Sequence, residues 1–128
     1  MIFLSNQELK WKVSDEGTQK ALEYIIDFSK DLSGFKGRAL KHGYMHAFGF
    51  LVDGQPIEER PFDFAVNKNS MKCYIRKAGL RRIGIAGRNR VKAEFPEADM
   101  LNDEFRVDLT SADEADRLLK CLFPRESG

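Results

Sequence analysis

The sequence predicts an α+β fold in which two longer helices and one short helix pack on a mostly antiparallel sheet of about four to five strands. Two observations support this prediction. Apolar residues alternate with polar ones along several short segments, which is typical of strands, and they recur at three- and four-residue spacing along others, which is typical of amphipathic helices. The predicted order of elements is β-α-β-β-β-α-β-α, with the helices on one face of the sheet.

The length and composition predict a single domain over residues 1–128. A chain of 128 residues lies near the commonest domain size, and 42% of the residues are apolar, including ten Phe, which is enough to bury a core. The longest apolar run, 47–52, is too short to cross a bilayer, and residues 1–5 do not resemble a secretory signal. We therefore expect a cytoplasmic protein.

The first half of the chain is predicted to contain two strands and one long helix. Residues 9–13 alternate in the manner of a strand, and 14–16 form a helix start with early acidic residues. An apolar stripe from Thr18 to Leu32 predicts the helix itself. Residues 34–43 are interpreted as a basic loop or a short irregular helix, and 44–52 as a strand buried on both faces.

The second half is predicted to begin with a hairpin and to end with a helix. Its strands are expected at 62–66 and 71–77, joined by a turn rich in Asn and Ser. A short helix is expected at 88–95, ended by a proline, followed by a strand at 104–109. Thr110 or Ser111 caps the final helix, and Ser111 and Glu114 have the spacing of a capping box.

Charge is unevenly distributed along the chain, although the formal net charge is only +1. Residues 64–93 contain nine Lys and Arg and no acid, a formal charge of +9, whereas 94–116 contain nine acids and one Arg, a formal charge of −8. A concentrated basic surface attracts polyanions, of which nucleic acid is the commonest. Alternatively, the two blocks pair with each other at the surface, where each exposed ion pair contributes about 0–1 kcal/mol.

The basic block predicts a nucleic-acid-binding surface on the second hairpin strand and the helix after it. Alternation over residues 71–77 places Tyr74 on a strand face with two cations, where its ring could stack on a base. Phe62 and Phe64 could extend this platform, although packing in the core explains them more simply. The candidate nucleic-acid-binding residues are Lys72, Tyr74, Arg76, Lys77, Arg81, Arg82, Arg88 and Arg90.

A glycine pair at Gly84 and Gly87 is a candidate anion-binding turn, because such a turn before a helix can direct backbone N–H groups at a phosphate. The segment 83–88, Ile-Gly-Ile-Ala-Gly-Arg, resembles the clamp loop of KH nucleic-acid-binding domains. It departs from that pattern because Val91, the first apolar helix residue, comes one place late, and because no helix is predicted ahead of Gly84. We therefore do not assign the chain to that family, and a plain glycine turn is the simpler interpretation.

Other reactive side chains are interpreted as structural. Cys73 and Cys121 are far apart in sequence and are expected to act as small core residues. His42 and His46 have helical spacing, but the strand pattern around them argues against a metal pair. Asp63 could serve as a nuclease carboxylate, but the matching acid before Lys72 is missing. The cluster 58–60, Glu-Glu-Arg, is interpreted as a solvated turn.

These patterns predict a small binding domain, not an enzyme, with nucleic acid as its partner and without a cofactor or metal. DNA and RNA fit the prediction equally. One alternative is a protein-interaction module that docks its basic face on an acidic partner or on the acidic block of a second copy. The other is a small hydrolase or nuclease in which Asp63, Glu58, Glu59 or the histidines converge on a pocket.

Overall fold

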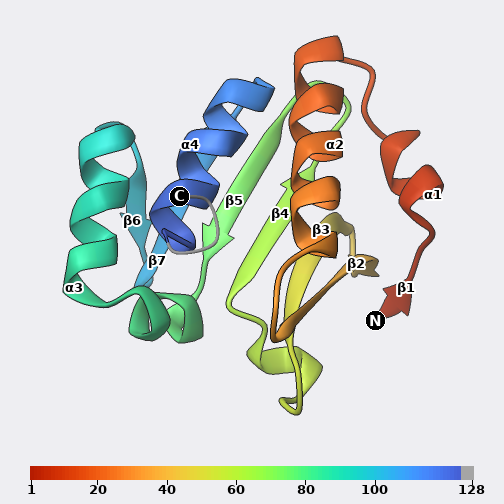
Figure 1. Ribbon diagram of the computed structural model, residues 1–128. Coiled ribbons are helices and arrows are strands. Elements are labelled where there is room, and N and C mark those ends of the chain that lie inside the picture. The colour runs from red at the N-terminus through yellow and green to blue at the C-terminus, as the bar shows by residue number, and fades with distance from the viewer. Residues whose placement is uncertain (125–128) are drawn as a thin grey trace.

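The computed structural model describes residues 1–124, which form a seven-stranded antiparallel sheet with α-helices packed on one face (Figure 1). The strands are β1 (Ile2–Phe3), β2 (Phe35–His42), β3 (Met45–Val52), β4 (Phe62–Val66), β5 (Met71–Ile75), β6 (Asp99–Leu101) and β7 (Glu104–Leu109). The helices are α1 (Asn6–Lys10), α2 (Glu16–Lys30), α3 (Lys77–Glu94), α4 (Ala112–Leu122) and the short 3-10 helix η1 (Ile57–Glu59). The strand order is β1-β2-β3-β4-β5-β7-β6.

The predicted α+β class with an antiparallel sheet is confirmed, but the predicted numbers of strands and helices are too low. Residues 1–124 contain seven strands and four α-helices rather than four to five strands and three helices. The edge strands β1 and β6, of two and three residues, are too short to show a periodic pattern in the sequence. No helix within residues 1–124 is both long and apolar enough to span a membrane.

The core lies between the sheet and the helices, and Figure 1 shows α2 and α4 side by side in front of the central strands. Strands β3 and β4 direct four phenylalanines toward these helices, each at most 1% exposed: Phe48, Phe50, Phe62 and Phe64. The predicted helix starts are confirmed, because Asp15 Oδ2 accepts from Thr18 N at 2.9 Å and Ser111 Oγ accepts from Glu114 N at 3.1 Å. These caps fix where α2 and α4 begin.

The strand predicted at residues 9–13 is wrong, because this segment ends helix α1 and continues into a turn. Ser5 and Glu8 form a capping box in which each side chain accepts from the other residue's backbone N–H at 3.0 Å. Leu9 and Val13 are buried and Trp11 is 73% exposed. The i, i+4 spacing of Leu9 and Val13 fits one face of a helical turn as well as alternate positions of a strand, so alternation alone was misleading.

The loop or irregular helix predicted at residues 34–43 is also wrong, because 35–42 form β2, which pairs with β3 along its whole length. Lys36 and Arg38 are exposed and alternate with Phe35, Gly37 and Ala39, but Gly37 contributes no apolar side chain to that pattern. Gly37 is under the ring of Phe48, where an added Cβ would come within 2.3 Å of Cζ. Glycine at this position reflects a close approach rather than a loop.

Helix α3 begins at Lys77 and not at Arg88, and it bends at Gly84. Leu80 and Ile83 in its first part and Val91 in its second part are all buried, so both parts pack on the core. Gly84 has φ 67° and ψ −169°, a conformation outside the helical region. The predicted strand end at Lys77 is therefore two residues too late, because β5 ends at Ile75.

Replacing Gly84 by Ala should lower the free energy of unfolding by about 1–3 kcal/mol, since this backbone conformation is essentially restricted to glycine. The cost is conformational, because nothing lies within 4 Å of the position that the new Cβ would occupy. Chemical denaturation followed by far-UV circular dichroism measures it. Ile85→Ala, at an adjacent side chain that is 77% exposed, is the control and should change stability by less than about 0.5 kcal/mol. Equal stability of the two variants would contradict the non-helical backbone conformation described for Gly84.

Candidate nucleic-acid interface

The eight predicted nucleic-acid-binding residues lie on two separate surfaces. Lys72, Tyr74 and Arg76 are on the open face of the sheet, because Cys73 and Ile75 between them are fully buried toward the helices. The other five, Lys77, Arg81, Arg82, Arg88 and Arg90, belong to α3, whose apolar side chains join the core on the opposite side of the sheet. The structure therefore separates the strand residues from the helix residues.

The two cations on the open face are paired with carboxylates. Lys72 Nζ lies 3.5 Å from Asp108 Oδ1, and Arg76 Nη1 lies 3.4 Å from Glu104 Oε1. Tyr74 between them is half-buried and opposite Asp63 in the β4–β5 pairing. Phe62 and Phe64 face the helices, so they do not extend a stacking platform around Tyr74.

A buried carboxylate holds two arginines on this same face. Asp63 is fully buried; its Oδ1 accepts from Arg60 Nε at 2.6 Å and its Oδ2 from Arg76 Nε at 2.8 Å. Arg60 is only 5% exposed and also donates from Nη1 to the Ile57 carbonyl at 3.1 Å. The interpretation of the 58–60 cluster as a solvated turn is therefore wrong for Arg60, which packs across β3 with its Cδ 3.1 Å from the Cβ position at Gly49.

Three basic side chains of α3 line one pocket. Lys77, Arg81 and Arg88, together called the bend cluster, line a pocket of about 280 Å³ with Leu80, Met100 and Asp103. None of the three forms an ion pair with any residue in the described part of the chain, 1–124. Lys77 and Arg81 precede the bend at Gly84 and Arg88 follows it, so the pocket spans both parts of the helix.

The remaining two helix arginines have defined contacts. Arg82 places its guanidinium carbon 4.7 Å from the centroid of the Phe35 ring, a cation–π contact at an exposed position. Arg90 donates from Nε and Nη2 to the Cys121 carbonyl at 3.2 and 3.1 Å and so ties α3 to the end of α4. Arg82 also lines a separate pocket that it shares with Arg81, whereas Arg90 is held in a helix–helix contact.

The two glycines, Gly84 and Gly87, are required for different structural reasons. Gly84 supplies the non-helical conformation at the bend, whereas Gly87 is buried against Ile83, where an added Cβ would lie 2.4 Å from the Ile83 Cβ. A helix does precede Gly84, contrary to the sequence-based expectation, because α3 begins at Lys77. One of the two departures from the KH clamp-loop pattern is thereby removed, while the late position of Val91 remains.

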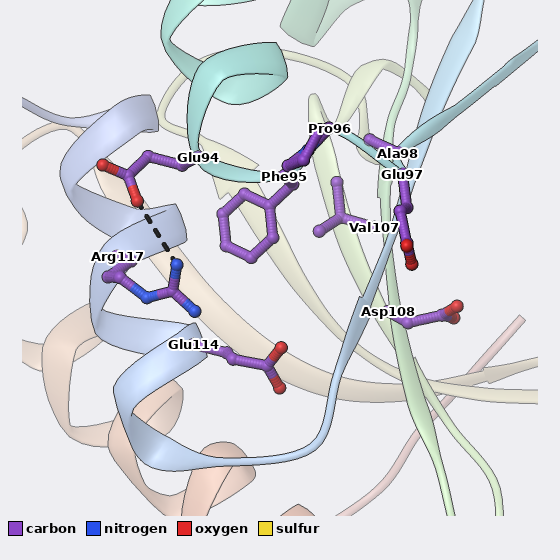
Figure 2. Close-up of a pocket in the computed structure, with 9 residues that line it drawn as sticks. All are labelled: Glu94, Phe95, Pro96, Glu97, Ala98, Val107, Asp108, Glu114 and Arg117. Atoms are coloured by element: carbon purple, nitrogen blue, oxygen red, sulfur yellow. Dashed lines mark hydrogen bonds and ion pairs between the residues drawn. The ribbon is translucent and has the colours of Figure 1, made fainter.

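The far end of α3 is acidic. A pocket at this end has a volume of about 250 Å³. In Figure 2, Phe95 and Val107 lie between Glu94, Arg117 and Glu114 on one side and Glu97 and Asp108 on the other. Arg117 Nη1 lies 3.3 Å from Glu94 Oε2 and its Nε 3.1 Å from Asp113 Oδ2, and the hydrogen bond to Glu94 raises the pKa of Arg117. Within residues 1–124, three acids of the block (Glu94, Asp113 and Asp116) pair with Arg117 and Lys120 of α4, and two (Glu104 and Asp108) pair with Arg76 and Lys72. Asp103 lines the pocket of the bend cluster but forms no ion pair with it.

The cysteines and histidines are not brought together. Both thiols are free and buried, and burial raises the pKa of Cys73 well above its ordinary value and also raises that of Cys121. His42 pairs with Met45 across the β2–β3 hairpin, so His42 and His46 point to opposite faces of the sheet. Burial, with Lys12 and Lys41 nearby, lowers the pKa of His46.

The carboxylates considered for a hydrolase or nuclease are separated. Glu58 and Glu59 line different pockets, Glu58 shares its pocket with His42, and Asp63 is fully buried with both oxygens on arginines. Within residues 1–124 no group of three His, Cys, Asp or Glu side chains is placed to hold a metal ion.

Comparison of the chain with protein-family models, curated proteins and solved structures gave no match.

Proposed function

We propose that this protein binds nucleic acid through the bend cluster and Arg82, by contact with the phosphate backbone. The observation that carries the proposal is the convergence of Lys77, Arg81 and Arg88 on one pocket without ion pairs to residues 1–124. Lys and Arg that are already neutralised gain little from a phosphate, whereas unpaired ones release counterions when they bind it. The proposal is narrower than the sequence-based one, because it leaves out Lys72, Tyr74, Arg76 and Arg90.

The charge distribution along α3 also favours one path of the nucleic acid over the protein. The bend cluster lies near the first part of the helix, and the acidic pocket around Glu94 lies at its C-terminal end. A polyanion is attracted to the first region and repelled by the second. We therefore expect the backbone of the nucleic acid to pass over the bend and to avoid the surface shown in Figure 2.

The test is a binding titration with fluorescently labelled single-stranded and duplex oligonucleotides at several salt concentrations. The affinity should fall as salt rises, with a slope of log K against log salt of about −0.9 for each phosphate contact in a duplex and about −0.7 in a single strand. The triple variant Lys77→Ala, Arg81→Ala, Arg88→Ala should bind more weakly and with a smaller slope. Arg81→Ala with Arg82→Ala should also weaken binding.

Lys72→Ala is the matched control, because it removes one cation of the same basic block from the open face of the sheet. It should leave both the affinity and the salt slope unchanged. If the Lys72 variant lost as much affinity as the triple variant, binding would instead be assigned to the open face of the sheet. Absence of salt-dependent binding by the unmodified protein would overturn the proposal.

A further inference from the structure

A second cavity, separate from the bend cluster, opens on the face of the sheet opposite the α-helices. It has a volume of about 350 Å³, within the range of small-ligand pockets, and is lined by Met1, His42, Met45, Glu58, Arg60 and Arg76. His42 and Met45 are opposite each other in the β2–β3 pairing, and Met45 is on the opposite face from the buried Phe48. The chemistry of this lining is mixed: two methionines, two guanidinium groups, a carboxylate and an imidazole.

The two arginines are fixed in place by groups behind the cavity. Asp63 accepts from Nε of both, and it is fully buried, so neither guanidinium is free to turn away without leaving that charge unpaired. Arg60 further donates from Nη1 to Ile57, and Arg76 from Nη1 to Glu104. Nη2 of each arginine makes no hydrogen bond to residues 1–124, and both arginines line the cavity.

The local charge balance selects among possible ligands. Two arginines and the α-ammonium group of Met1 contribute +3, while Asp63, Glu104 and Glu58 contribute −3, so the surroundings carry no net charge and do not favour a simple anion. Asp63 and Glu104 are engaged by the arginines, whereas Glu58 is exposed, lines the cavity and makes no ion pair within residues 1–124. A ligand that carries one negative and one positive group satisfies the Nη2 donors and Glu58 together.

We propose that this cavity binds a free α-amino acid with an apolar side chain. The carboxylate would accept from Nη2 of Arg60 and Arg76, the ammonium group would face Glu58, and the side chain would contact Met1 and Met45. Planar guanidinium groups match the geometry of a carboxylate, and methionine side chains adapt to apolar ligands of differing shape.

Isothermal titration calorimetry of the full chain with L-phenylalanine tests the proposal, with two blocked analogues as comparisons. Phenylalanine should bind at least about tenfold more tightly than N-acetylphenylalanine, which lacks the ammonium group, and than phenylalaninamide, which lacks the carboxylate. Glu58→Gln should weaken phenylalanine binding and leave N-acetylphenylalanine unaffected. Arg76→Lys should weaken the binding of both phenylalanine and N-acetylphenylalanine, which carry the carboxylate. Circular dichroism checks that this variant is folded.

The two proposals for this protein fail independently. The bend-cluster triple variant should bind phenylalanine as the unmodified chain does, and Glu58→Gln should leave oligonucleotide binding unchanged. No heat of binding with any of the three compounds would overturn the amino-acid site. Equal affinity for phenylalanine and N-acetylphenylalanine would overturn it as well, because Glu58 would then have no role.

Discussion

Replacing Asp63 by Ala should lower the free energy of unfolding by about 3–5 kcal/mol, among the largest effects of any single substitution in this chain. Asp63 is fully buried and is the carboxylate partner of Arg60, which is itself only 5% exposed. Without it the Arg60 charge stays in the protein with only the Ile57 carbonyl as acceptor. Arg76 is less affected, because it is 32% exposed and retains Glu104. Urea denaturation followed by circular dichroism measures the loss.

The control is Asp108→Ala on the same face of the sheet, where the side chain is 77% exposed and pairs with Lys72. This change should cost no more than about 1 kcal/mol. A double variant, Asp63→Ala with Arg60→Met, should be more stable than the sum of the two single changes predicts, because no buried charge is left unpaired. Simple additivity would show that Arg60 and Asp63 are not energetically coupled.

Elements with a long and regular pattern could be predicted from the sequence, and those shaped by close packing could not. The stripes of α2 and α4, the β4–β5 hairpin and the strand at 104–109 all follow from apolar periodicity. Strand β2 was missed because Gly37 interrupts the alternation to make room for the Phe48 ring. Helix α1 was missed although Ser5 and Glu8 carry the sequence signature of a capping box, which should have outweighed three alternating residues.

The candidate sites, too, could be predicted from the sequence only in part. That residues 64–93 lack acids is visible in the sequence, but only the structure shows that Lys77, Arg81 and Arg88 line one pocket while Arg90 donates to the Cys121 carbonyl. The sequence does not indicate that Arg60 is buried, because a charged residue in a polar cluster is normally solvated. The feature that could have indicated it is Asp63, a lone acid within an apolar strand, which requires a buried cationic partner.

Phe50→Ala should also lower the free energy of unfolding by about 3–5 kcal/mol, since the ring is fully buried at the centre of the aromatic core. Its ring centroid lies 5.4 Å from that of Phe64 and 5.8 Å from that of Phe123, which follows helix α4. The substitution therefore removes contacts between two strands and between the sheet and the last helix. The loss is a large part of the 5–15 kcal/mol that typically stabilises a domain, so the variant should unfold at a markedly lower urea concentration.

Tyr44→Ala is the matched control for this change, because it removes an aromatic ring that is fully exposed in the β2–β3 turn, six residues before Phe50. It should alter stability by less than about 0.5 kcal/mol, which separates the effect of burial from the effect of losing an aromatic side chain near β3. Phe50→Leu should fall between the two, since it keeps most of the apolar volume but loses the ring contacts. Equal stability of Phe50→Ala and Tyr44→Ala would mean that this ring does not join the sheet to α4, and the packing described for the core would then be wrong.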